Sequence, residues 1–117
     1  MTRHVVERLE EERVAYAPVP GLPALRDAAA SELSEYHGRS IGRDEILISC
    51  GAKHSLANLF MVTLSPGDEV VIPTPYWVSY PAMVELGSGT PVFVEAAAER
   101  GFKLDPERLA SALSDRT

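Results

Sequence analysis

The sequence contains little cysteine and no long apolar run. Cys50 is the single cysteine among 117 residues, so a disulfide bond within the chain is excluded. No apolar segment approaches the ~18 residues that a membrane-spanning helix requires. The N-terminus also lacks the apolar core of a signal peptide. We therefore expect a protein of the reducing cytoplasm that does not insert into a membrane.

An excess of positive charge is also missing. The formal net charge is −6 at pH 7, and the eleven lysines and arginines are scattered without forming a basic stripe. Nucleic acid and anionic membranes are therefore not expected as partners. The apolar share of 45% and the charged share of 24% are typical of a globular protein with a core. A chain of this length provides at most one domain.

Several motifs of ligand-binding and catalytic proteins are absent. Neither G-x-x-x-x-G-K-[ST] nor G-x-G-x-x-G occurs, which removes the usual support for nucleotide binding. No G-x-S-x-G supports a hydrolase, and the spacing of His4, His37 and His54 does not suit a metal site. Lys53 and Lys103 are the only lysines that could form a Schiff base, and neither is placed for covalent catalysis.

The stretch from Ile46 to Phe60 changes its period at a glycine. The apolar run Ile46–Ile48 predicts a strand, Gly51 a tight turn, and the apolar positions that follow recur at helical steps of three and four. The free N–H groups of such a turn and the positive end of the helix favour an anion such as phosphate, and Lys53 adds a full charge. Most junctions of this kind hold no ligand, so this pattern alone leaves the site open. Cys50 beside the turn is expected to be a small buried thiol and not a nucleophile.

The remaining pattern predicts helices separated by strands. We expect helices over 2–15, from Pro23 to Gly38, from about Ala52 to Leu64, from Pro81 to near Gly87, and after the N-cap pair Asp105-Pro106. Strands are expected at Glu45–Cys50, at Val70–Ile72 with Pro73 ending it, and at Val92–Val94. Prolines exclude regular structure between Tyr16 and Pro23. This alternation predicts an α/β fold with parallel strands, whose ligands lie beyond the carboxyl ends of the strands.

Trp77, the only tryptophan, lies between a proline-rich turn and a helix start. It is interpreted either as a core or hinge aromatic, or as a platform for a flat ring, where stacking adds about 0.5–1.5 kcal/mol beyond burial. Tyr76 and Tyr80 flank it and are expected to be packing residues.

Four segments together carry a family resemblance. They are Tyr16-Ala-Pro-Val-Pro-Gly-Leu-Pro-Ala-Leu-Arg26, Cys50-Gly-Ala-Lys53, Pro66-Gly-Asp-Glu-Val-Val-Ile-Pro73 and Pro75-Tyr-Trp-Val-Ser-Tyr80. In this order and spacing the chain resembles the class I/II, fold-type-I aminotransferases that use pyridoxal 5′-phosphate, and most closely their bacterial aspartate aminotransferase branch. The resemblance implies that 1–117 form a single partial domain, a piece of the three-layer α/β/α large domain with an incomplete sheet. It also implies that the strand before Gly51 lies far from the other two.

Residue roles follow from the resemblance position by position. Gly51, Ala52 and Lys53 correspond to the turn that holds the cofactor phosphate, and Trp77 to the aromatic that stacks on the pyridine ring. Tyr16 resembles the tyrosine that reaches the phosphate of the other subunit, which implies a homodimer. The full-length protein would transfer an amino group between an amino acid and a 2-oxo acid.

The family's remaining functional residues are not expected in this chain. Its Schiff-base lysine, the aspartate and asparagine at the ring, and the arginine that binds the substrate carboxylate all come later than Thr117. We therefore assign no catalytic residue and expect an excerpt of a longer protein. Two alternatives stay open: a truncated, non-catalytic remnant that binds a partner or nothing, and a related decarboxylase or lyase on the same scaffold.

Overall fold

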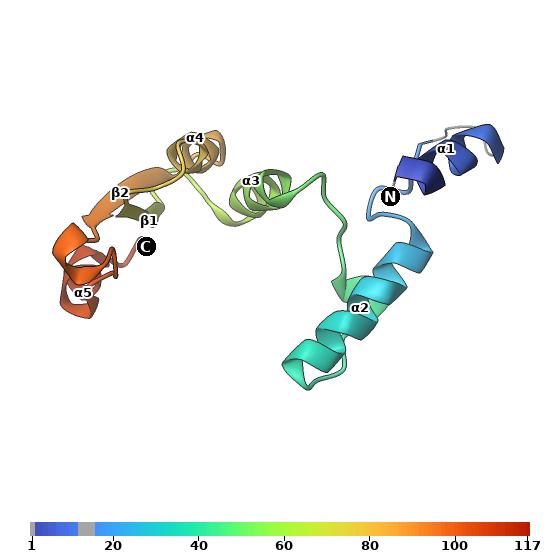
Figure 1. The fold of residues 1–117 in the computed structure, drawn as a ribbon. Helices are drawn as coiled ribbons and strands as arrows, with labels where there is room; N and C mark the ends of the chain where they lie inside the picture. Colours follow the sequence, from blue (N-terminus) through green and yellow to red (C-terminus); the bar gives the residue numbers. More distant parts are fainter. Residues whose placement is uncertain (1, 12–15) are drawn as a thin grey trace. The chain divides into compact units, whose positions relative to one another are not determined.

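The computed structural model describes residues 2–11 and 16–117, and the chain divides into two compact units, Met1–Ser49 and Cys50–Thr117 (Figure 1). Helix α1 spans Thr2–Glu11, inside the helix expected over 2–15, whose last positions lie outside the described residues. Within these ranges no helix is both long and apolar enough to cross a bilayer.

In the first unit, helix α2 spans Pro23–His37 with its ends where the sequence predicts them. Pro23 occupies the first turn, where its missing N–H is not needed. Gly38 ends the helix at φ 63°, in the left-handed conformation that glycine adopts without strain. The guanidinium of Arg26 extends from this helix and donates to the carbonyl oxygens of Ile46 (2.9 Å) and Arg43 (2.7 Å).

The prediction of a strand at Glu45–Cys50 is wrong. Arg43–Glu45 form a short 3₁₀ helix, η1, and the segment 46–49, which begins with Ile46 in an extended conformation, joins no strand among the described residues. Its Ile48 N–H donates instead to the Pro20 carbonyl at 3.0 Å. An apolar run identifies a segment that can form a strand, but a strand also needs a neighbouring strand to bond to.

The loop before α2 is irregular, as its prolines predict, and packs directly on the segment 46–49. Gly21 has a φ of 103°, and a Cβ atom there would lie 2.6 Å from the Cβ of Ile48. No other residue type fits this approach without displacing Ile48.

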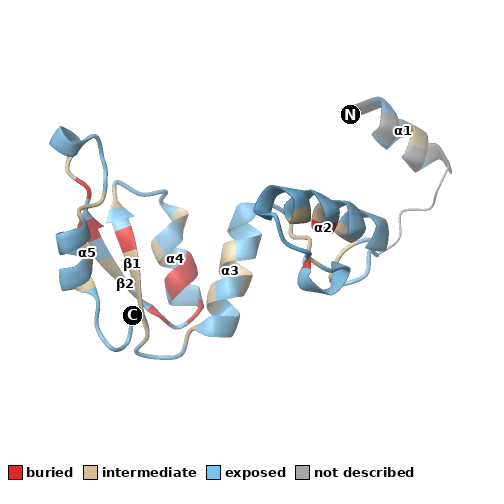
Figure 2. Ribbon diagram, turned by 90° about the horizontal axis from the view of Figure 1, so that it is seen from below, coloured by how far each residue is buried: buried red, intermediate tan, exposed pale blue. Residues whose placement is uncertain are grey.

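The second unit is a parallel two-stranded sheet with helices on both sides. Strand β1 (Glu69–Thr74) pairs with β2 (Thr90–Glu95) in a register that sets Glu69 opposite Thr90. Helix α4 (Ser79–Leu86) connects the strands and lies on one side of the sheet, while α5 (Pro106–Ala112) lies on the other (Figure 2). Helix α3 (Ala52–Thr63) packs against α4, and the 3₁₀ helix η2 (Ala98–Arg100) follows β2. The expected α/β class with parallel strands is confirmed.

Buried side chains of this unit lie on both faces of the sheet and on α4. Ile72 and Val94 are buried in the paired strands and point to opposite faces, because Ile72 pairs with Phe93, and Met83 and Val84 are buried on α4. Val84 has no exposed surface at all. Burial of such side chains contributes roughly 1.5–3 kcal/mol each.

Two boundaries differ from expectation. Strand β1 continues through Pro73, and α4 begins at Ser79, two residues before Pro81. The carbonyl oxygens of Asp68 and Thr74 accept hydrogen bonds from Thr90 and Ala96, so alternate residues of β1 face β2 and Pro73 faces the other edge. A proline there removes no hydrogen bond from the ladder, which is why the strand does not stop.

Candidate functional site

The glycine turn leaves three backbone donors free. Gly51 has φ 88° and ψ 169°, and its carbonyl accepts from the N–H groups of His54 (3.1 Å) and Ser55 (3.2 Å) as α3 begins. The N–H groups of Gly51, Ala52 and Lys53 donate to no group among the described residues. These donors and the positive end of a 12-residue helix point to an anion.

Cys50 and His54 lie at the base of this turn. The Cys50 N–H donates to Nδ1 of His54 at 3.1 Å, so this ring nitrogen is an acceptor. The expectation of a buried thiol is wrong, because Cys50 is exposed together with the start of α3. His54 is exposed, and the sequence does not predict its hydrogen bond. The sequence feature that could have indicated this hydrogen bond is the position of His54, four residues after Cys50 and within the first turn of the helix.

Lys53 and Trp77 come together in the second unit. Lys53 Nζ lies 5.2 Å from the centroid of the Trp77 ring, within the range of a cation–π interaction. The Trp77 side chain is 57% exposed, which excludes a core position and leaves ring surface available. The sequence placed both residues at one end of the strands without predicting this contact.

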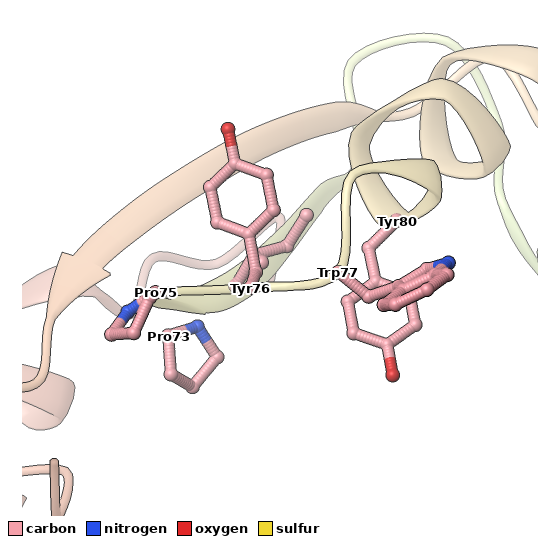
Figure 3. A pocket seen from close by; sticks show the side chains of 6 residues that line it. Pro73, Pro75, Tyr76, Trp77 and Tyr80 are labelled. Carbon is pink, nitrogen blue, oxygen red and sulfur yellow. The ribbon is translucent and has the colours of Figure 1, made fainter.

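A pocket of about 470 Å³ opens beside Trp77, lined by Ile72, Pro73, Pro75, Tyr76, Trp77 and Tyr80. Figure 3 shows Tyr76 pointing away from Trp77 and Tyr80. The Tyr76 ring stacks on Phe93 of β2, with 5.1 Å between ring centroids, so it has the packing role expected for it. The pocket follows the carboxyl end of β1, where ligands of parallel sheets bind.

Tyr16 is the one predicted site residue outside this unit. It belongs to the first unit, at the start of the loop before α2, and its side chain is fully exposed. Residues 2–11 and 16–117 contain no cluster of histidine, cysteine and acidic side chains that could hold a metal ion.

The family model for aminotransferases of class I and II matches residues 3–117. This chain belongs to that family. Among aminotransferases of known sequence, it is 43% identical over 112 residues to the aspartate aminotransferase of Geobacillus stearothermophilus, covering 96% of this chain and 28% of that protein. It is 44% identical over 109 residues to the aspartate/prephenate aminotransferase of Thermus thermophilus, covering 93% of this chain and 28% of that protein.

Solved aminotransferase structures have the same fold. An aspartate aminotransferase from Thermotoga maritima matches 99% of this chain and 31% of its own with a TM-score of 0.93 and 33% identity. A single mutant of the Thermus thermophilus enzyme matches 99% of this chain and 30% of its own, with a TM-score of 0.91 and 40% identity. The resemblance to the fold-type-I family and its aspartate branch is thus confirmed. The chain spans about 28% of the length of these curated relatives.

Proposed function

We propose that this chain is the cofactor-phosphate and ring-binding part of an aminotransferase that uses pyridoxal 5′-phosphate. The free N–H groups of Gly51, Ala52 and Lys53 would bind the phosphate, with the Lys53 ammonium as its counter-charge. The indole of Trp77 would support the pyridine ring. When bound, the cofactor supplies the electron sink for amino-group transfer.

The approach of Lys53 to Trp77 is the observation that carries this proposal. A ligand with an anionic group and a flat ring needs a cation and donors next to an exposed aromatic face, and the 5.2 Å contact brings these groups together. Since Lys53 belongs to the first turn of α3 and Trp77 follows β1, two separate elements would contribute to binding one ligand.

The proposal extends to the whole protein. We propose a cytoplasmic homodimer in which Tyr16 of one subunit reaches the cofactor phosphate of the other, and its full exposure leaves the phenol free to do so. The substrates would be an amino acid and a 2-oxo acid. Aspartate is the first amino donor to test, because the relatives from Geobacillus and Thermus carry it in their names.

Binding of pyridoxal 5′-phosphate to the full-length protein tests this function. In equilibrium dialysis, we expect Trp77→Ala to weaken binding by about two- to tenfold, the loss of one stacking interaction. Trp77→Phe, which keeps a ring, should lose less. Tyr36→Ala removes another exposed aromatic and should leave the affinity unchanged.

Each alternative has its own outcome in these assays. Absence of cofactor binding would support the non-catalytic remnant and end the proposal. Binding without amino transfer from aspartate or other donors, but with release of carbon dioxide or ammonia, would support a decarboxylase or lyase. Equal affinities of the Trp77→Ala variant and the unmodified protein would show that the indole does not contact the ring.

A further inference from the structure

We infer that His54 is a positioning residue of the phosphate-binding turn: its Nδ1 holds the Cys50 N–H and thereby fixes the peptide units that present the free donors. This inference rests on the function proposed above. In the role inferred here, the His54 side chain acts through the backbone and does not itself contact the cofactor.

The geometry anchors both sides of the Gly51 N–H. On one side, the imidazole of His54 accepts from the Cys50 N–H at 3.1 Å. On the other, the Gly51 carbonyl accepts from the His54 backbone N–H at 3.1 Å and from Ser55 at 3.2 Å. The peptide unit between Cys50 and Gly51, which carries the Gly51 N–H, is therefore held between two fixed neighbours.

Such an anchor matters because Gly51 is the most adaptable residue of the turn. Glycine populates positive and negative φ about equally, so at φ 88° its conformation must be imposed by its surroundings. A donor that is fixed before binding does not have to be ordered when the anion binds, and affinity rises accordingly. Among the described side chains, only His54 holds the Cys50 N–H; Ser55 Oγ lies 3.5 Å from the Gly51 carbonyl instead.

A neutral imidazole also suits the charge of the site. In a capping box, a glutamate at this third helical position accepts instead from the N–H of the N-cap residue, which here is Gly51. A carboxylate at His54 would add a negative charge beside the phosphate. An imidazole that accepts at Nδ1 carries its proton on Nε2 and provides the hydrogen bond without that charge.

The test compares two ligands that differ only in the phosphate. Pyridoxamine 5′-phosphate and unphosphorylated pyridoxamine, neither of which links covalently to lysine, are titrated into the full-length protein by calorimetry. We expect His54→Phe, which keeps a ring but has no acceptor, to weaken binding of the phosphorylated ligand about fivefold, and binding of pyridoxamine less than twofold. His54→Asn, whose Oδ1 replaces Nδ1, should restore the phosphate-dependent part.

The other outcomes are distinct. Unchanged affinity in His54→Phe, or equal weakening of both ligands, would overturn the inference, and so would failure of His54→Asn to restore affinity. If the unmodified protein bound neither ligand, the proposed function itself would fall, and the inference with it. The urea midpoint of each variant identifies a folding defect, and His54→Ala replaces His54→Phe if the latter does not fold.

Discussion

Gly87, which follows the last residue of helix α4, lies close against the backbone of helix α3. A Cβ atom at this position would lie 2.8 Å from the carbonyl carbon and oxygen of Phe60, which are backbone atoms and cannot rotate away. We expect Gly87→Ala to push the helices apart and to destabilise the full-length protein by about 1–3 kcal/mol, the usual cost of overpacking. The midpoint of urea unfolding measures the change.

Gly42→Ala is the matched control. At Gly42 the φ of −86° suits any residue, and an added Cβ would meet only the Glu45 carboxylate at an ordinary 3.7 Å. The stability should change by less than about 0.5 kcal/mol. A similar loss in both variants would contradict the steric explanation.

At the scale of elements, the start of α5 depends on a carboxylate. The Asp105 side chain accepts from the Glu107 N–H at 3.0 Å and forms an ion pair with Arg100. The hydrogen bond from Glu107 is the largest cause that lowers the pKa of Asp105, and the charge of Arg100 adds to it. The ionised Asp105 carboxylate therefore stabilises the folded protein above its unfolded-state pKa of about 3.9. This stabilisation is lost as the pH falls through the lower pKa that Asp105 has in the folded protein.

We expect hydrogen exchange in α5 to become faster on acidification below about pH 4, once the intrinsic exchange rate is corrected for. The Leu109 N–H, which donates to the Asp105 carbonyl at 2.9 Å, reports on this turn. Asp105→Asn keeps a capping side chain but cannot titrate, so its corrected exchange should change less with pH. Parallel pH profiles for the two proteins would rule out the carboxylate as the cause.

The helices were more predictable than the strands because their ends are encoded locally. Pro23 and Gly38 delimit α2, and Asp105 caps α5, through groups within a few residues of each end. The prediction of a strand at Glu45–Cys50 was wrong because a strand needs a neighbouring strand as its hydrogen-bonding partner, and the sequence of the segment does not show whether one is present. The prediction that Pro73 ends β1 was wrong for a related reason. Only the pairing of β1 with β2 shows which edge of the strand the Pro73 nitrogen faces.

At the scale of the whole molecule, the candidate site was predictable in composition but not in contacts. Gly51, Lys53 and Trp77 were identified from the sequence, and the roles assigned to them remain proposals. The approach of Lys53 to Trp77 depends on how α3 packs beside the sheet, and no periodicity encodes that. The exposure of Cys50 was missed for the same reason.

The succession β1–α4–β2 also has a consequence for the order of folding. The bond from the Thr90 N–H to the Asp68 carbonyl closes a short loop, whereas the bond from the Glu69 N–H to the Arg116 carbonyl closes one about twice as long. Each doubling costs about 0.6 kcal/mol in closure entropy, and contacts close in sequence form sooner. In pulse-labelled refolding of the full-length protein, the amides of Thr90 and Ala96 should gain protection before that of Glu69. Simultaneous protection would mean that the segment around Arg116 docks in the same step, whereas the expected order makes the strand pair the early nucleus of this unit.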